Sequence, residues 1–236
     1  MSAAVDIAAS ALKGIGWAAL PLLLLPAVYI VVPGLRGLKA FCDAIIKLID
    51  DVSYGVGEVI KWALPLLVLS VAFGVFALSI FGVSWTKLFE SATYFHASVI
   101  MLGSAATLLA GQHVRVDVFH DTMSQHKRAW VDFIGFYALL APVCLIILWD
   151  SQSFVNFAWR IFEGSNEADG IKGVFLLKTL IPIFALMMTA QALAIALRAA
   201  MCLNGDTRPT RPPGIAKLFA PDDEPHEGIS HSEAGL

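Results

Sequence analysis

A run of 25 residues without a charged side chain, from Trp62 to Thr86, lies between Lys61 and Lys87. An α-helix rises about 1.5 Å per residue, so about 20 apolar residues cross the ~30 Å hydrocarbon core of a bilayer. Tryptophans stand near both ends of the run, at Trp62 and Trp85, and tryptophan is enriched at membrane–water interfaces. We therefore predict a tilted transmembrane helix over this run.

The composition of the whole chain is that of a membrane protein. Of its 236 residues, 58% are hydrophobic and 15% are charged, and the mean hydropathy is +0.74. This leaves too little polar surface for a soluble domain. The formal net charge of -3 gives no reason to expect a nucleic-acid partner. The cysteines Cys42, Cys144 and Cys202 are far apart and odd in number, so we predict reduced packing residues.

A short polar turn separates two other apolar segments. The sequence GQHVRVD at Gly111–Asp117 follows an uncharged run that begins at Ser91 and precedes another, Phe133–Trp149. An arginine at the centre of a membrane costs about 2.5–3.5 kcal/mol on insertion scales, so the turn is expected at the level of the lipid headgroups. Four residues are predicted to define this turn: Gly111, His113, Arg115 and Asp117.

Two more apolar segments complete a set of four spans. The third span is predicted to start after the capping residue Ser124 and to run through Trp149, and the fourth runs from about Val174 to Arg198. Basic and aromatic residues mark their interfacial ends, namely Lys127, Arg128 and Trp130 on the third and Lys178 on the fourth. The predicted fold class is an all-α integral membrane protein with four transmembrane helices.

An extra hydrophobic segment, Gly14–Leu35, precedes these spans. It has no charged residue, but it contains Pro21, Pro26 and Pro33, and each proline removes a backbone hydrogen-bond donor. We predict that it crosses the membrane and places the N-terminus outside. The alternative is an interfacial or re-entrant segment supported by a partner subunit.

These patterns divide the chain into four parts. Residues 1–40 form an N-terminal hydrophobic extension, 41–61 an amphipathic helix, 62–203 the four-helix membrane domain, and 204–236 a disordered tail rich in proline and acidic residues. In the second part, apolar residues recur every three or four positions, at Phe41, Ile45, Leu48, Val52, Val56 and Val59, while Asp43, Lys47, Asp50 and Asp51 hold another face. Such a helix either lies flat in the membrane interface or packs on a neighbouring subunit.

The distribution of basic residues predicts the orientation. Eleven of the 16 Lys and Arg residues fall in segments 34–61, 113–128 and 198–236, and five fall in the N-terminus, at Lys87 and in segment 160–178. Basic segments stay on the cytoplasmic side. The polar turn and the C-terminus are therefore predicted inside, and the acidic loop after the third span outside.

The sequence contains no pattern for catalysis or metal binding. His113, His120 and His126 lack HExxH spacing, and the chain has no CxxC pair and no Walker loop. The core of the spans offers only His96, although a chain that moves a solute by itself usually has ionisable residues or broken helices at mid-membrane. We therefore expect no enzyme activity, no cofactor, no metal and no substrate site in this chain.

Several motifs together resemble the small (Q-type) membrane subunit of TRAP transporters, the tripartite ATP-independent periplasmic class. These are Trp85 with Glu90, MLG at Met101–Gly103, GQHVRVDVF at Gly111–Phe119 and RAWVDFIG at Arg128–Gly135. The sequences EGSNE at Glu163–Glu167 and LKTLIP at Leu177–Pro182, with Gln191 beyond them, are most similar to the branch labelled mannitol or chloroaromatic. The resemblance covers roughly residues 50–203.

The resemblance implies a scaffolding permease subunit of the bacterial inner membrane. A large membrane subunit would carry an organic acid or similar solute with a sodium gradient, after a periplasmic solute-binding protein has delivered it. The expected partners of this chain are the large subunit, the binding protein and membrane lipids. The residues expected at a subunit or membrane interface are Trp85, Glu90, Lys127, Arg128 and Lys178. The alternative function is a membrane scaffold or accessory subunit of another complex, without a role in solute transport.

Overall fold

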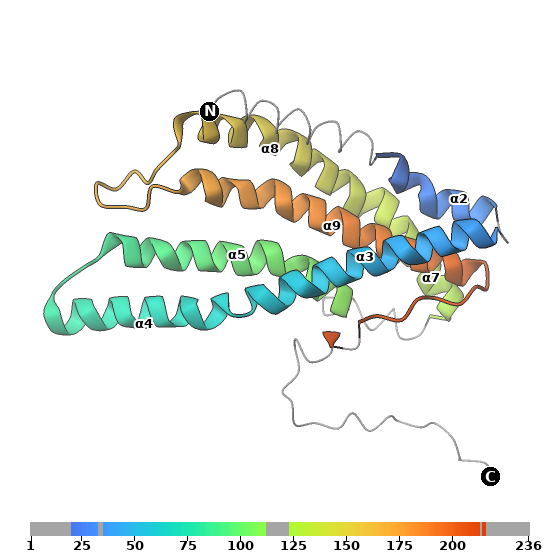
Figure 1. The fold of residues 1–236 in the computed structure, drawn as a ribbon, viewed down its shortest axis with the longest axis horizontal. Helices are drawn as coiled ribbons and strands as arrows, with labels where there is room; N and C mark the ends of the chain where they lie inside the picture. Colours follow the sequence, from blue (N-terminus) through green and yellow to red (C-terminus); the bar gives the residue numbers. More distant parts are fainter. Residues whose placement is uncertain (1–19, 33–34, 112–122, 213, 216–236) are drawn as a thin grey trace, which may run out of the picture.

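The computed structural model describes residues 20–32, 35–111, 123–212 and 214–215, which form helices joined by turns and loops (Figure 1). In chain order the elements are η1 (Leu20–Leu24), α2 (Leu25–Val31), α3 (Arg36–Ile60), α4 (Ala63–Phe81), α5 (Thr86–Ala110), α7 (Gln125–Gly135), η2 (Phe136–Leu140), α8 (Ala141–Ile161) and α9 (Val174–Leu203).

Within the described residues, four helical stretches are long and apolar enough to cross a membrane, namely Arg36–Phe81, Thr86–Ala110, Gln125–Ile161 and Val174–Leu203. A shorter apolar helix, Pro21–Val31, precedes them. This confirms the predicted all-α membrane fold with four long apolar helices and an additional N-terminal hydrophobic segment.

α3 and α4 form one bent rod, interrupted by a turn at Lys61 and Trp62 (Figure 1). Pro65, in the first turn of α4, has no N–H to donate to the Lys61 carbonyl, which favours a break at this point. The rod contains 46 residues. That length corresponds to about 70 Å of helix, more than twice the ~30 Å hydrocarbon core. Since α4 falls within the predicted span, α3 has to leave the membrane or run obliquely in it.

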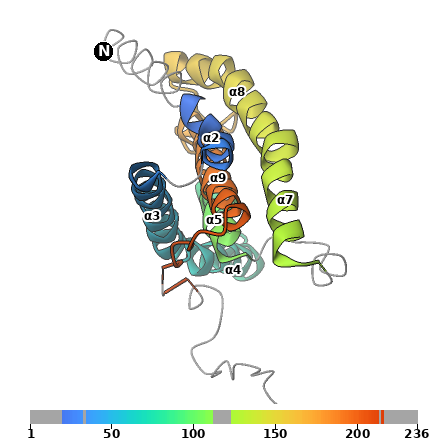
Figure 2. The same cartoon turned by 90° about the vertical axis from the view of Figure 1, so that its right-hand side faces the viewer.

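α9 lies at the centre of the bundle, with α2, α3, α5, α7 and α8 packed against it (Figure 2). Its C-terminal half is buried almost without interruption, from Gln191 to Met201. This half is rich in alanine, and small residues let neighbouring helix backbones approach closely. The last span is therefore the core of the subunit.

α7 and α8 form one long helix that widens at a π-helical turn, η2. Pro142 stands at the start of α8, where its ring would clash with the carbonyl of residue 138 in a regular α-helix. A π turn adds a residue to the turn and relieves that clash. In this widened turn Phe136 is buried in the core, and Tyr137 lies beside η1 and α2.

Hydrogen bonds at both ends hold η1 and α2 in the bundle. Tyr29 Oη donates to Asp206 Oδ2 at 2.7 Å, and Asn204 Nδ2 donates to the Tyr29 carbonyl at 2.7 Å. Tyr137 Oη donates to the Leu23 carbonyl at 2.6 Å. The described helix is shorter than a membrane span, and residues 14–19 and 33–34 lie outside the described ranges, so the fifth crossing stays a prediction.

The first part of the segment predicted as a tail is in contact with the helices. Besides the bonds of Asn204 and Asp206, Arg208 Nη2 donates to Gln125 Oε1 at 3.4 Å, and Arg198 Nε donates to the Pro209 carbonyl at 3.5 Å. This segment therefore connects α2, α7 and α9 at one end of the bundle. Residues 216–236 lie outside the described ranges, and disorder there stays a prediction.

Candidate functional site

α3 presents different faces to the core and to its surroundings. The face toward α5 and α9 consists of five buried residues, Cys42, Ile46, Asp50, Ser53 and Gly57. Apolar residues singled out in the sequence lie on another face, and four of them are at least half exposed: Phe41 (51%), Leu48 (65%), Val52 (52%) and Val59 (74%). The helix thus offers an apolar strip outward while a carboxylate faces the core.

Asp50 and Arg198 form a buried ion pair between α3 and α9. Asp50 is 1% exposed and Arg198 is 9% exposed. Arg198 Nη2 pairs with Asp50 Oδ2, and Nη1 donates to Oδ1 at 3.3 Å. Two more buried side chains extend the network, because Gln191 Nε2 donates to Asp50 Oδ1 at 3.1 Å and Ser53 Oγ donates to Gln191 Oε1 at 2.8 Å.

The helical spacing brings these four groups together. Gln191 and Arg198 are two turns apart on one face of α9, and Asp50 and Ser53 are three residues apart on α3. A buried carboxylate is costly unless it is paired and hydrogen-bonded, and here it has a guanidinium group and an amide. The network therefore fixes the rotation and the register of α3 against α9.

The predicted polar face of Asp43, Lys47, Asp50 and Asp51 is wrong for Asp50. Lys47 and Asp51 are exposed, whereas Asp50 faces α9. The sequence contains a signal for this orientation, since Asp50 follows Ile46 at the same four-residue spacing at which Ile46 follows Cys42. Its partner Arg198 is predicted from the sequence only as the end of the last span.

A second polar cluster joins the start of α5 to the loop between α8 and α9. Glu90 accepts hydrogen bonds from Ser165 Oγ and, at 2.6 Å, from the Ile171 backbone N–H. Lys87 Nζ lies 2.7 Å from Asp169 Oδ1 in an exposed pair. Glu90, predicted only as an interface residue, therefore holds the loop against its own subunit.

Lys178 lies at the same end of the bundle and contacts residues of α8 and of the loop that follows it. Its Nζ donates to both carboxylate oxygens of Glu163, at 2.6 and 2.7 Å, and lies 3.9 Å from the centre of the Phe154 ring. Nearby, Trp159 Nε1 donates to Thr179 Oγ1 at 2.8 Å. The ammonium group is thus bound inside the subunit by an ion pair and a cation–π contact.

The other predicted interfacial residues lie near the starts of α5 and α7, which are at opposite ends of the bundle (Figure 1). Trp85 is 49% exposed and stacks on Phe73 with the ring centres 5.8 Å apart. Lys127 is exposed in the first turn of α7. Arg128 Nε donates to the Met123 carbonyl at 3.1 Å.

Gly111 ends α5 in the left-handed conformation, with φ 76° and ψ 15°. Glycine adopts this conformation without the steric penalty of a Cβ atom, so it is the usual residue at such a helix end. The other predicted turn residues, His113, Arg115 and Asp117, lie outside the described ranges. The role of the whole turn stays a prediction.

We expect Gly111→Ala to lower the free energy of unfolding by about 1–2 kcal/mol, the cost of a Cβ atom in the left-handed region. The added atom would also lie 3.4 Å from Arg211 Nη1. Thermal unfolding of the purified chain in detergent measures the effect. Gly55→Ala is the matched control, because Gly55 lies inside α3 and a Cβ there meets nothing within 4 Å. Equal destabilisation by both changes would contradict the prediction.

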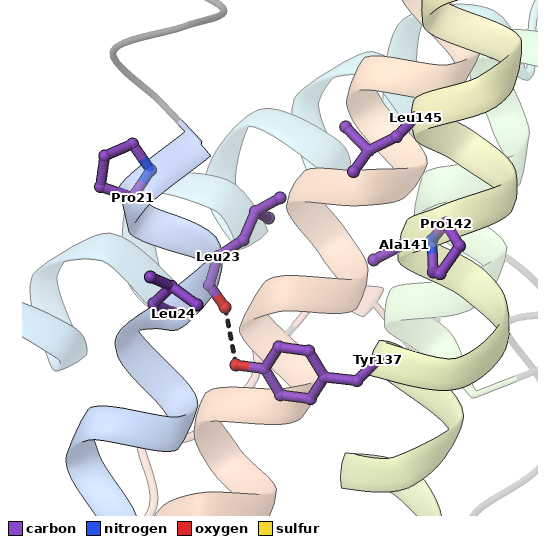
Figure 3. Close-up of a pocket in the computed structure, with 7 residues that line it drawn as sticks. All are labelled: Pro21, Leu23, Leu24, Tyr137, Ala141, Pro142 and Leu145. Carbon is purple, nitrogen blue, oxygen red and sulfur yellow. Dashed lines mark hydrogen bonds between the residues drawn. The ribbon is translucent and has the colours of Figure 1, made fainter.

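Two apolar hollows on the described surface lie beside the N-terminal helices. One, of about 540 Å³, lies between η1 and α8 and is lined by residues such as Leu23, Leu24 and Leu145 (Figure 3). Another, of about 390 Å³, lies between α2 and α7. Within the described ranges, no three His, Cys, Asp or Glu residues are grouped in a way that could hold a metal ion. The arrangement suits helix packing and contact with apolar partners.

Comparison with known proteins identifies a family whose model matches this chain. The family model described as "Tripartite ATP-independent periplasmic transporters, DctQ component" matches residues 67–201, more than half of the chain. The match begins within α4 and ends within α9, so η1, α2 and α3 precede it. No curated protein and no solved structure was found to match the chain.

Proposed function

Since the chain belongs to the DctQ component family of tripartite ATP-independent periplasmic (TRAP) transporters, we propose that it is the scaffold on which the large membrane subunit assembles. The family confirms the resemblance to the small permease subunit, a multi-pass membrane component of a transporter rather than an enzyme. It favours the transporter over an accessory subunit of an unrelated complex.

The uncovered apolar faces of α3 and α4 carry the scaffold proposal. In α4 the buried residues are Ala63, Ser70, Gly74 and Ala77, all small, while the large apolar side chains point outward. α3 continues this surface with Leu48, Val52 and Val59. A surface of this length, opposite the face that packs on α5 and α9, is suited to a second membrane protein as well as to lipid.

The proposed solute is an organic acid or a similar compound, in the branch labelled mannitol or chloroaromatic. In this proposal the large subunit moves the solute with a sodium gradient after the periplasmic binding protein delivers it. In this proposal the small subunit binds no solute itself, and among the described residues the buried charges of Asp50 and Arg198 pair with each other. Its contribution is to hold the large subunit.

Reconstitution tests this proposal. We expect the chain to co-purify with a large TRAP membrane subunit when the two are produced together, and we expect proteoliposomes with both subunits and the binding protein to take up solute. Proteoliposomes with the chain alone should show only background uptake. Uptake by the chain alone, or full uptake by the large subunit without it, would contradict the proposal.

The proposal also places the C-terminus in the cytoplasm and the loop between α8 and α9 outside. In a variant without the three native cysteines, Asn166→Cys should react with a membrane-impermeant maleimide in intact spheroplasts, and Thr207→Cys only after permeabilisation. The reverse pattern would refute this orientation. A third variant, Ser2→Cys, tests the fifth crossing, since protection in intact spheroplasts would mean that residues 14–35 do not cross.

A further inference from the structure

The two apolar hollows are adjacent along α7, η2 and α8 and share Tyr137 as a lining residue, and we call them together the groove. Leu24 and Leu145 line the first hollow, Ala27 and Ile134 line the second, and Tyr137 lines both. Figure 3 shows the first hollow between the two helices, with α9 behind it. The groove lies partly outside the region of the family match, because η1 and α2 supply one wall.

The polar side-chain group of this groove already has a hydrogen-bond partner. The Tyr137 hydroxyl, the one polar side-chain group among the lining residues, donates to the Leu23 carbonyl at 2.6 Å (Figure 3). A backbone carbonyl that faces hydrocarbon without a donor is costly, so this bond lets η1 line an apolar surface. What remains is a hollow that offers van der Waals contact and no free hydrogen-bonding side chain.

The groove has the length of one lipid leaflet and a cation at its end. From Phe133 to Leu145 the helix rises about 18 Å, and half of the ~30 Å hydrocarbon core is about 15 Å. Lys127 is exposed and stands seven residues before Ile134, two turns away on the same face. Trp130, 41% exposed, lies between them at the position of an interfacial aromatic residue.

We propose that this groove binds one acyl chain of an anionic phospholipid whose phosphate group lies against Lys127. The order along α7 and α8 is a cation, an aromatic residue and an apolar groove. A phospholipid has the matching order of phosphate, ester region and acyl chain. The exposed Arg208, which reaches Gln125 at the start of α7, adds positive charge at the same end. This proposal goes beyond the transporter function and does not depend on the orientation in the membrane.

Native mass spectrometry of the full-length chain, alone and with the large subunit, tests the proposal. The probes are phosphatidylglycerol and phosphatidylcholine with identical acyl chains. We expect phosphatidylglycerol to be retained about fivefold more, the factor for about 1 kcal/mol from one basic residue near the phosphate. Lys127→Ala should lower this preference and leave phosphatidylcholine retention unchanged. Ala138→Trp, which fills the second hollow, should lower the retention of both lipids.

Two control variants lie outside the groove. Lys172→Ala removes an exposed lysine from the loop between α8 and α9, and Leu186→Trp enlarges a side chain of α9 that is 53% exposed. Both should retain lipid as the unmodified chain does. An unchanged preference in Lys127→Ala, or unchanged retention in Ala138→Trp, would overturn the proposal. Loss of the large subunit from Ala138→Trp, with lipid retention unchanged, would instead assign the groove to that protein.

Discussion

Replacing Arg198 by methionine is expected to destabilise the subunit by about 3–5 kcal/mol, the cost of leaving a buried charge without its partner. Asp50 is 1% exposed, and after this change the Gln191 amide would be the remaining donor to its carboxylate among the described residues. The apparent Tm in detergent should fall by about 6–20 °C, since 1 kcal/mol corresponds to about 2–4 °C in a protein of this size. Size-exclusion chromatography of heated samples of a fluorescent fusion measures it.

A double variant distinguishes the effect of the unpaired charge from the effect of altered packing. In Asp50→Asn with Arg198→Met no buried charge remains, and the asparagine oxygen can still accept from Gln191, so most of the loss should be recovered. Asp51→Asn is the matched control, because Asp51 is the exposed neighbour of Asp50 and its change should leave the Tm unchanged. A double variant as unstable as Arg198→Met would refute the charge explanation.

Replacing Gly170 by alanine is expected to cost about 1–3 kcal/mol, the range for overfilling a packed site. The new Cβ atom would overlap Ser165 and lie 2.7 Å from Glu90 Oε1, so the loop could not keep both hydrogen bonds to Glu90. Limited proteolysis at Lys172, which follows this contact in the loop, should become faster. Mass spectrometry of the fragments measures the rate.

Two further variants define the cause of that effect. Glu90→Ala removes the acceptor from the Ile171 N–H and the Ser165 hydroxyl, and should also speed cleavage at Lys172. Glu167→Ala lies in the same loop, but its side chain is exposed, and it should cleave at the rate of the unmodified chain. Normal cleavage of both Gly170→Ala and Glu90→Ala would show that this contact does not hold the loop.

The membrane spans were predictable from the sequence because hydrocarbon imposes a length and a composition on each helix. The run Trp62–Thr86 contains α4, and the predicted end of the second span at Gly111 is the end of α5. Gly111 was recognisable because a glycine that follows a long apolar helix commonly ends it. These features depend on residues that are close together in the chain.

The interactions between distant segments were not predictable in the same way. Asp50 and Arg198 are 148 positions apart, and an amphipathic pattern does not reveal which carboxylate is turned inward. The Glu90 contact likewise depends on how the loop between α8 and α9 folds back on α5. The groove at Tyr137 arises from the π turn and from the packing of η1. Neither feature has a periodic pattern of hydrophobic residues by which it could be predicted.

The Asp50–Arg198 pair also has a consequence for the biosynthesis of the chain. α3 is made early and α9 last, so the Asp50 carboxylate has no cationic partner from α9 until 148 more residues have been translated. At about 5–20 residues per second this takes about 7–30 s. During that interval the face of α3 that later packs on α9 carries an uncompensated charge, which opposes its burial. A nascent chain that stops before Arg198 would keep this charge unpaired, so its α3 is expected to pack less stably than in the completed subunit.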